Sequence, residues 1–200
     1  MIIINSIKKS LETLKKLYPN AEFIDVTSKS DSKWVKLSPF FPHYDIPVPD
    51  SPGVTSTCVE AIWQGLKVFK YADIDISLFR NDTMRNIKRT TKRFGIPLGH
   101  RYGVNSSEIL SYIDARKKIY IPIYFWVLKN KVFPLIEELY QISQVKDVVL
   151  LDYDINCEVE NSAKPLSHAS LIKRFIEENF NKKKEPQYKQ LSLFEDVETK

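Results

Sequence analysis

Three polar side chains at helical spacing form the first group in this sequence that could do chemistry. Glu60, Gln64 and Lys67 occupy positions i, i+4 and i+7, so a helix over residues 59–69 would present them on one face. A carboxylate, an amide and an ammonium group are then held together, as proton transfer and substrate binding require. The alternative interpretation is an ordinary solvated helix face with an ion pair.

The rest of the chain must position this helix, and it predicts a single α/β (α+β) domain, mainly helical around a small central sheet. Residues 148–151 form a short apolar run bounded by charges, as expected of a central strand covered on both faces. Asp152 lies at the exit of that strand. One hydroxyl of Thr55, Ser56 or Thr57 is expected to cap the helix.

The other elements are predicted from hydrophobic spacing, turn residues and prolines. Strands are expected over residues 22–27 and 34–37, and a loop over residues 95–105. Residues 38–53 form a long proline-rich segment, whose length favours a functional role. Helices are expected over residues 7–17, 84–94, 107–128 with an interruption around Pro122, 133–143, and from Leu171 to near Asn179.

Composition limits the class of protein. With 43% hydrophobic residues among 200, the chain can bury a core of its own. No apolar run approaches the roughly 20 residues of a membrane span, and the first residues lack the pattern of a signal peptide. Cys58 and Cys157 lack zinc-like spacing, so no metal or cofactor is expected. We therefore expect a cytoplasmic protein.

A basic segment predicts a surface that faces phosphate. The net charge of +5 is mild, but the cations of residues 80–101 are accompanied by a single acid, Asp82. Such a concentration of positive charge favours a polyanionic partner, and DNA is the partner expected here. The residues expected to contact the DNA backbone are Lys88, Arg89, Lys92 and Arg93.

Three landmarks in order along the chain resemble the NADAR family. They are residues 38–41 (Ser-Pro-Phe-Phe), 60–67 (Glu-Ala-Ile-Trp-Gln-Gly-Leu-Lys) and 92–95 (Lys-Arg-Phe-Gly). Members of that family are α/β proteins that hydrolyse N-glycosidic bonds in nucleotide intermediates or between ADP-ribose and guanine. The resemblance implies that Glu60 is the family's helix glutamate and Lys67 its substrate-contacting lysine.

The implied chemistry explains the residue types. Breaking a sugar-to-base bond develops oxocarbenium charge, so a carboxylate that stabilises this charge or activates water lowers the barrier. Glu60 and Asp152 are the expected catalytic pair, with Asp152 preferred over Asp154. Lys67, His168 or the other carboxylate would assist the departing base. The expected substrate-binding residues are Phe40, His43, Trp63, Gln64, Lys67, Arg101, Tyr102, Tyr153, Asn156 and His168.

The C-terminal segment carries a different kind of signal. Residues 190–194 (Gln-Leu-Ser-Leu-Phe) resemble the consensus peptide by which bacterial polymerases and repair proteins bind the replication sliding clamp. A domain over residues 1–180 and a flexible tail over residues 181–200 are therefore expected. The tail could instead fold back on the domain or bind another partner. The clamp-binding residues would be Gln190, Leu191, Leu193 and Phe194.

The tail and the resemblance together predict a DNA N-glycosidase. Such an enzyme extrudes a nucleotide and releases a modified base, for example a glycosylated hydroxymethylcytosine in viral DNA. Removal of ADP-ribose from guanine in DNA is the close alternative. A non-catalytic adaptor of DNA or the clamp, and a glycosidase of free nucleotides, are the other two possibilities.

Overall fold

The apolar run that precedes Asp152 forms the centre of the main sheet. In the computed structural model, which describes residues 1–180, β8 (Val148–Asp152) pairs in parallel with β1 (Ile2–Ser6) on one side and β2 (Glu22–Asp25) on the other. All residues of β8 are buried. The predicted central strand is confirmed, and so is the mixed α and β class of a single compact domain.

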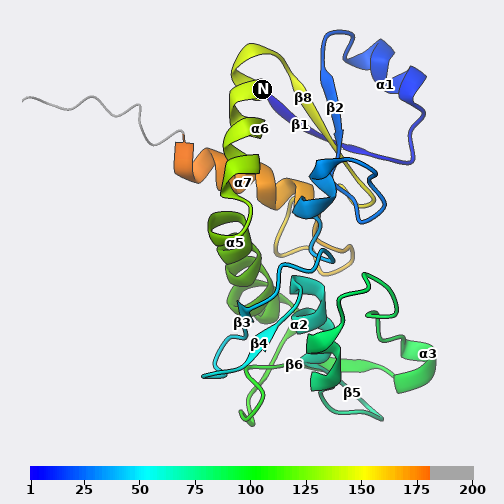
Figure 1. The fold of residues 1–200 in the computed structure, drawn as a ribbon. Coiled ribbons are helices and arrows are strands. Elements are labelled where there is room, and N and C mark those ends of the chain that lie inside the picture. Colours follow the sequence, from blue (N-terminus) through cyan, green and yellow to red (C-terminus); the bar gives the residue numbers. More distant parts are fainter. Residues whose placement is uncertain (181–200) are drawn as a thin grey trace, which may run out of the picture.

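Alternate residues of β8 pack into two different cores, because successive side chains of a strand point to opposite faces. Val148 and Leu150 join the main core, whereas Val149 and Leu151 surround Leu14 of α1 (Leu11–Leu17). The long helix α7 (His168–Phe180) contacts β1 and β8 from the main-core side. Figure 1 shows α1 and α7 on opposite sides of this sheet.

A second, antiparallel sheet lies at the other end of the molecule (Figure 1). Its strands are β5 (Lys67–Phe69), β6 (Pro97–Arg101) and β7 (Ile109–Leu110), in that order. A two-stranded ladder of β3 (Ile46–Pro47) and β4 (Thr55–Ser56) lies nearby. β6 falls within residues 95–105, so the prediction of a loop there is wrong.

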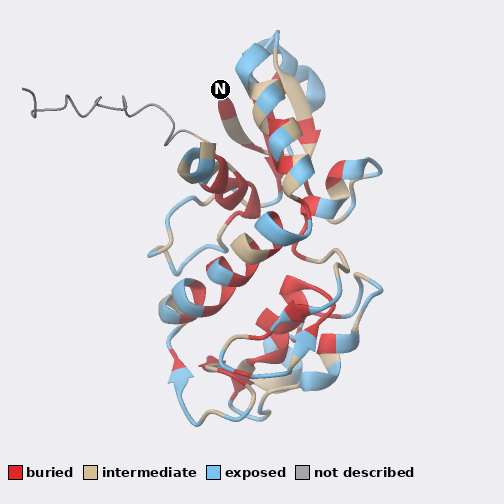
Figure 2. Ribbon diagram, turned by 60° about the vertical axis from the view of Figure 1, so that its left-hand side comes forward, coloured by how far each residue is buried: buried red, intermediate tan, exposed pale blue. Residues whose placement is uncertain are grey.

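The helix that carries Glu60 is shorter than predicted. α2 (Val59–Gly65) is buried along its whole length (Figure 2), and the next residues form β5. Gly65 is the last residue of the helix, and the Phe79 ring packs directly against it, since a Cβ on Gly65 would lie 2.5 Å from that ring. The helix is capped by the Cys58 thiol, which accepts from the Ala61 amide at 3.4 Å, and not by the hydroxyls of residues 55–57.

Two further local predictions are wrong. Residues 34–37 belong to the 3-10 helix η1 (Lys33–Leu37), because the Ser32 hydroxyl accepts from the Trp34 amide and starts a turn. Only α3 (Thr91–Phe94) is helical within residues 84–94. The chain before α3 takes left-handed conformations at Met84 and Asn86, and it follows the 3-10 helix η2 (Ile76–Arg80).

The helical half of the chain agrees more closely with the sequence, although the helix predicted over residues 107–128 begins only at Tyr112, because residues 109–110 pair with β6 as β7. α4 (Tyr112–Ala115), the π-helical turn η3 (Arg116–Tyr120) and α5 (Ile121–Asn130) follow without a gap, with Pro122 in the first turn of α5. α6 (Phe133–Val145) comes next. Within residues 1–180, no single helix is long and apolar enough to cross a membrane. The helical segments 112–130 and 133–145 meet the criteria of length and apolarity only when taken together, and a bend of 86° separates them.

Candidate active site

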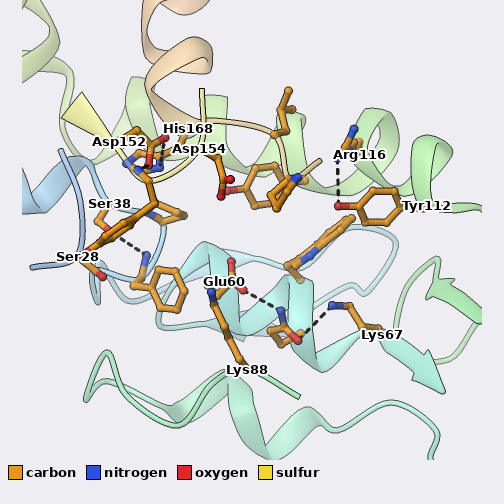
Figure 3. Close-up of a pocket in the computed structure, with 18 residues that line it drawn as sticks. Ser28, Ser38, Glu60, Lys67, Lys88, Tyr112, Arg116, Asp152, Asp154 and His168 are labelled. Carbon is orange, nitrogen blue, oxygen red and sulfur yellow. Dashed lines mark hydrogen bonds and ion pairs between the residues drawn. The ribbon is translucent and has the colours of Figure 1, made fainter. Parts of the chain in front are cut away.

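A cavity of about 340 Å³ opens where the carboxyl ends of β2 and β8 face α2 (Figure 3). Its volume is in the range of small-molecule sites, and the carboxyl ends of parallel strands are where such sites commonly form. The lining residues are Ser28, Ser38, Pro39, Phe40, Glu60, Trp63, Gln64, Lys67, Lys88, Tyr112, Arg116, Tyr120, Asp152, Tyr153, Asp154, Pro165, Leu166 and His168.

Glu60 provides the floor of the cavity with a buried carboxylate. Its backbone amide donates to the Pro39 carbonyl at 2.9 Å, which ties α2 to the proline-rich segment. Among the described residues, only the Gln64 amide donates to the Glu60 carboxylate, to Oε1 at 2.8 Å. Burial raises the pKa of Glu60, and the Gln64 hydrogen bond and the Lys67 charge only partly oppose this. Oε2 is therefore available to a substrate or water.

Gln64 holds Glu60 in a fixed orientation. The Gln64 Oε1 atom accepts from the Arg89 backbone amide at 3.1 Å and from Lys67 Nζ at 3.3 Å. With its oxygen so engaged, Gln64 can turn only its NH₂ group toward Glu60. The sequence pattern of Glu60, Gln64 and Lys67 thus corresponds to one hydrogen-bonded chain, although Lys67 lies in β5 and not on the helix.

Asp152 lies across the cavity in very different surroundings. Its Oδ2 atom accepts from the Ser167 hydroxyl at 2.7 Å and from the Ala169 amide at 3.3 Å, and it lies 3.0 Å from His168 Nδ1. Oδ1 accepts from the Tyr153 amide at 2.7 Å. Burial alone would raise the pKa of Asp152, but His168 and these donors lower it.

His168 completes a buried ion pair with Asp152. Its Nε2 atom lies 2.8 Å from the Val26 carbonyl, so both ring nitrogens face acceptors. Burial opposes a charge on the ring, yet Asp152 and the Val26 carbonyl raise the pKa of His168. An imidazolium that donates to both partners satisfies this geometry. The pair joins the end of β8, the start of α7 and the segment after β2.

Asp154 reaches the cavity from the roof loop, which we define as residues 153–167. Figure 3 shows its carboxylate pointing toward that of Glu60 across the cavity. Among the described residues, no hydrogen bond or ion pair engages the Asp154 carboxylate. The geometry therefore favours Asp154 over Asp152 as the carboxylate that faces a substrate together with Glu60.

Two lysines bring positive charge to the cavity without a salt bridge to any described residue. Neither Lys67 nor Lys88 forms an ion pair within residues 1–180, and burial lowers the pKa of Lys67 despite the charge of Glu60. Lys88 Nζ lies 5.6 Å from the centre of the Phe40 ring. The loop that carries Lys88 is anchored by Ile87, which packs with Cys58 and Ala61 of the α2 region.

The prediction that Arg89 contacts the DNA backbone is not supported by its position. Arg89 is buried, and its guanidinium donates to the backbone carbonyls of Lys67 at 2.6 Å and Asp73 at 2.7 Å. These bonds attach the basic loop to β5, so Arg89 is a structural residue. Lys92 and Arg93 are exposed on α3 and line no part of the cavity.

Four predicted substrate-binding residues lie outside the cavity because neighbouring groups hold their side chains. His43 Nε2 lies 2.8 Å from the Lys36 carbonyl, and Arg101 donates to Asp73 at 2.5 and 2.7 Å. Tyr102 packs against the main core, and the Asn156 amide donates within the roof loop. The remaining predicted substrate-binding residues, which line the cavity, are Phe40, Trp63, Gln64, Lys67, Tyr153 and His168.

The sequence interpretation missed Tyr112, Arg116 and Tyr120, which lie on the helices behind the cavity. The Arg116 guanidinium is buried and donates to the carbonyls of Val159 and Asn161 at 2.8 Å each, and to that of Lys164 at 2.5 Å. It thereby holds the roof loop. A signal existed, since Arg116 shares the helical spacing of the buried Ile119 and Ile123.

Comparison with known proteins adds family membership. Among curated proteins, none matches this chain. The predicted clamp-binding residues 190–194 lie outside the residues that the structure describes. One family model, described as a family of unknown function (DUF6939), matches residues 6–172, a span that contains every residue of the cavity. Because this span covers most of the 200 residues, the chain belongs to that family.

Proposed function

We propose that this protein is an N-glycosidase that hydrolyses the bond between sugar and base of a modified nucleotide in DNA. The observation that carries the proposal is Glu60: a buried carboxylate with a raised pKa and one available oxygen, inside a cavity that also holds unpaired cations. Perturbed carboxylates in a concave site are characteristic of acid and base catalysis.

The residues around Glu60 suit each part of a bound nucleotide. Phe40, Trp63 and Tyr153 offer aromatic surface to a base. Lys67 and Lys88 offer positive charge to phosphate, and neither has a carboxylate partner within the described residues. Such a set accommodates a nucleotide that has been turned out of a strand.

The reaction then follows from the two facing carboxylates. Ionised Glu60 takes a proton from water as the water oxygen bonds to the sugar C1′ atom and the bond from C1′ to the base nitrogen breaks. Asp154 stabilises the positive charge that develops on the sugar. The proton taken by Glu60 finally reaches the released base, so that one water is divided between sugar and base.

Asp152 and His168 have a positioning role in this scheme. All the polar atoms of the pair are engaged with each other or with backbone and hydroxyl groups. A carboxylate bound in this way is a poor base, because its charged form is already stabilised. The pair fixes the start of the roof loop, and thus the place of Asp154.

The removal of ADP-ribose from guanine in DNA is a second candidate, favoured by one observation. Two unpaired lysines line the same cavity, and a diphosphate would engage both. The two reactions differ in what leaves the strand. The first yields a free modified base and an abasic site, whereas the second releases ADP-ribose and restores guanine.

A direct assay separates these reactions. Oligonucleotides that carry glucosylated hydroxymethylcytosine or ADP-ribosylated guanine are incubated with the protein, and the released molecules are identified by mass spectrometry. We expect release of the modified base by the wild type and by Glu12→Gln, an exposed control on α1, and none by Glu60→Gln. Release of ADP-ribose alone would favour the second candidate. Equal activity of Glu60→Gln and the wild type would contradict both.

A further inference from the structure

An exposed aromatic ring with cations around it lies outside the cavity, near the end of β5. Tyr71 is 71% exposed, which is unusual for a large aromatic side chain with no described partner for its hydroxyl. Ile96 and Leu98, on the segment that pairs with β5 and the turn after it, are 70% and 58% exposed. Large apolar side chains that gather on a surface commonly mark a binding site.

The Tyr71 ring is held in place by the turn beneath it. Gly95 has a φ of +82°, and a Cβ at that position would lie 2.8 Å from Tyr71 Cδ2, so the ring rests directly on the glycine backbone. The Tyr71 amide donates to the Phe94 carbonyl at 3.1 Å, and the Lys70 amide donates to the Ile96 carbonyl at 2.9 Å. A ring fixed in this way presents a flat face at low entropic cost.

The cations on the segments next to Tyr71 lack acidic partners among the described residues. Lys70, Lys92 and Arg93 are exposed, and none forms an ion pair within residues 1–180. Lys70 Nζ lies 5.1 Å from the centre of the Tyr71 ring. The nearby Asp73 is already paired with Arg101. This surface therefore has free positive charge beside an apolar, aromatic centre. Figure 1 shows α3, which carries Lys92 and Arg93, beside this end of the sheet.

The surface is joined rigidly to the cavity. Lys70 lies three residue steps after Lys67 of the cavity, a distance of about 10 Å along a strand, or roughly three stacked nucleotides. The Arg89 guanidinium bridges the two, because it donates to the Lys67 carbonyl and lies 4.8 Å from the Phe94 ring centre. A strand whose nucleotide enters the cavity can thus extend over Tyr71.

We propose that Tyr71, Lys70, Lys92 and Arg93 form a platform that binds a single nucleic-acid strand, with a base stacked on Tyr71 and phosphates near the cations. Aromatic faces flanked by cations are the common means of binding single strands. The identity of the strand as DNA that flanks the target nucleotide rests on the proposed function.

Binding of fluorescent oligothymidylate and of an abasic oligonucleotide of equal length, followed by anisotropy, tests the platform. Tyr71→Ala is expected to weaken binding of oligothymidylate roughly 5- to 150-fold, the loss of one stacked base, and to leave the abasic strand unaffected. Tyr71→Phe is expected to retain wild-type affinity for both. An equal loss on both strands, or no loss, would overturn the proposal.

The cations have their own test. Replacing Lys92 and Arg93 by Gln is expected to weaken binding of both strands and to reduce the salt dependence by about 1.4 in logarithmic slope. The matched control replaces Lys8 and Lys9, two exposed lysines at the other end of the molecule, and should leave the slope unchanged. Equal slopes in both double variants would refute the role of the cations. Binding of polyglutamate but not of oligothymidylate by the wild type would point instead to an acidic protein partner.

Two of these variants, Glu60→Gln and Tyr71→Ala, also separate this proposal from the catalytic one. Glu60→Gln is expected to bind oligothymidylate as the wild type does, and Tyr71→Ala to hydrolyse the isolated modified nucleotide at the wild-type rate. If the strand-binding results hold but no base is released from any substrate, only the proposed function fails. If Glu60 is required for base release but Tyr71→Ala binds normally, only the platform fails.

Discussion

The cavity is lined by two buried carboxylates, Glu60 of α2 and Asp152 at the end of β8, and their surroundings have opposite effects on them. Glu60 on the floor has a single donor and a raised pKa. Asp152 below the roof loop has donors on both oxygens, an ion pair with His168 and a lowered pKa. Their difference shows that burial alone does not identify a catalytic group; what matters is whether the charged form is already satisfied.

The same distinction applies to the arginines and lysines around the cavity. Arg116 donates its hydrogen bonds to backbone carbonyls of the roof loop and holds that loop in place. Arg89 likewise donates to backbone carbonyls and attaches the basic loop to β5. Lys67 and Lys88 have no ionic partner among the described residues. Groups that bind other parts of the protein build the cavity, and groups left unsatisfied are the ones available to a ligand.

The largest expected effect is the loss of activity in Glu60→Gln. Removal of the only carboxylate on the floor should lower kcat by about 10²- to 10⁴-fold, the range for a general base. The folded protein should be no less stable in urea, because a carboxyl whose folded pKa is raised destabilises the fold at neutral pH. A large loss of stability together with activity would remove the contrast between Glu60 and Asp152.

Asp152→Asn should show the opposite behaviour. The substitution leaves His168 without its counter-charge in a buried site, at a cost of about 3 kcal/mol in the free energy of unfolding. This is the lower end for a broken buried pair, since His168 can release its proton. Urea denaturation measures the loss. A fully stable but inactive Asp152→Asn variant would indicate that Asp152, and not Asp154, is the second catalytic carboxylate.

Asp154→Asn sharpens the same comparison with a smaller effect. Because the Asp154 carboxylate has no described partner, its removal should leave the free energy of unfolding unchanged. The rate of base release should fall by about 100-fold if Asp154 stabilises the developing charge. Single-turnover kinetics give this rate directly. Wild-type kinetics in this variant would leave Glu60 without the partner we assign to it.

Arg116→Lys should act on the roof loop. A lysine cannot reproduce a guanidinium fork that reaches three carbonyls, and we expect a loss of about 2 kcal/mol in unfolding free energy. Limited proteolysis should then cut within residues 153–167 earlier than in the wild type. Lys129→Arg, a change at an exposed lysine near the end of α5, serves as the control. If the roof loop resists proteolysis equally in both variants, Arg116 does not hold it.

The Asp152 and His168 pair also predicts how stability depends on pH. The lowered pKa of Asp152 adds stability that is present above about pH 4 and is lost as the pH falls through the folded value. The raised pKa of His168 adds stability that is present below about pH 6.5 and is lost as the pH rises through the folded value. The free energy of unfolding of Asp152→Asn should therefore depend less on pH than that of the wild type, both near the pKa of Asp152 and near that of His168.

The sequence was most informative where hydrophobic pattern and topology agree. The apolar run before Asp152 predicted β8 correctly, because a strand covered on both faces needs a short apolar run of this kind. Glu60 and Asp152 were expected to face one cavity, and both line it. The identity of the carboxylate opposite Glu60 depended on the roof loop, whose path is set by Arg116 and by the Ser167 hydrogen bond, contacts that no local pattern encodes.

Local patterns failed where distant contacts decide the conformation. Residues 67–69 have helical spacing with α2, but pairing with β6 draws them into a strand. Residues 84–90 have the composition of a basic helix, yet Ile87 and Arg89 are held against α2 and β5 in an irregular loop. In both places tertiary hydrogen bonds outweigh helix propensity, which amounts to less than about 1 kcal/mol per residue.

The contrast between Glu60 and Asp152 can be measured directly by ¹³C NMR titration of their side-chain carboxyl carbons, assigned with the Glu60→Gln and Asp152→Asn variants. We predict that the pKa of Glu60 lies above, and that of Asp152 below, the ordinary value for each side chain. A Glu60 that titrates at or below its ordinary value, with Asp152 above its own, would contradict the assignment of chemistry to Glu60 and of structural support to Asp152.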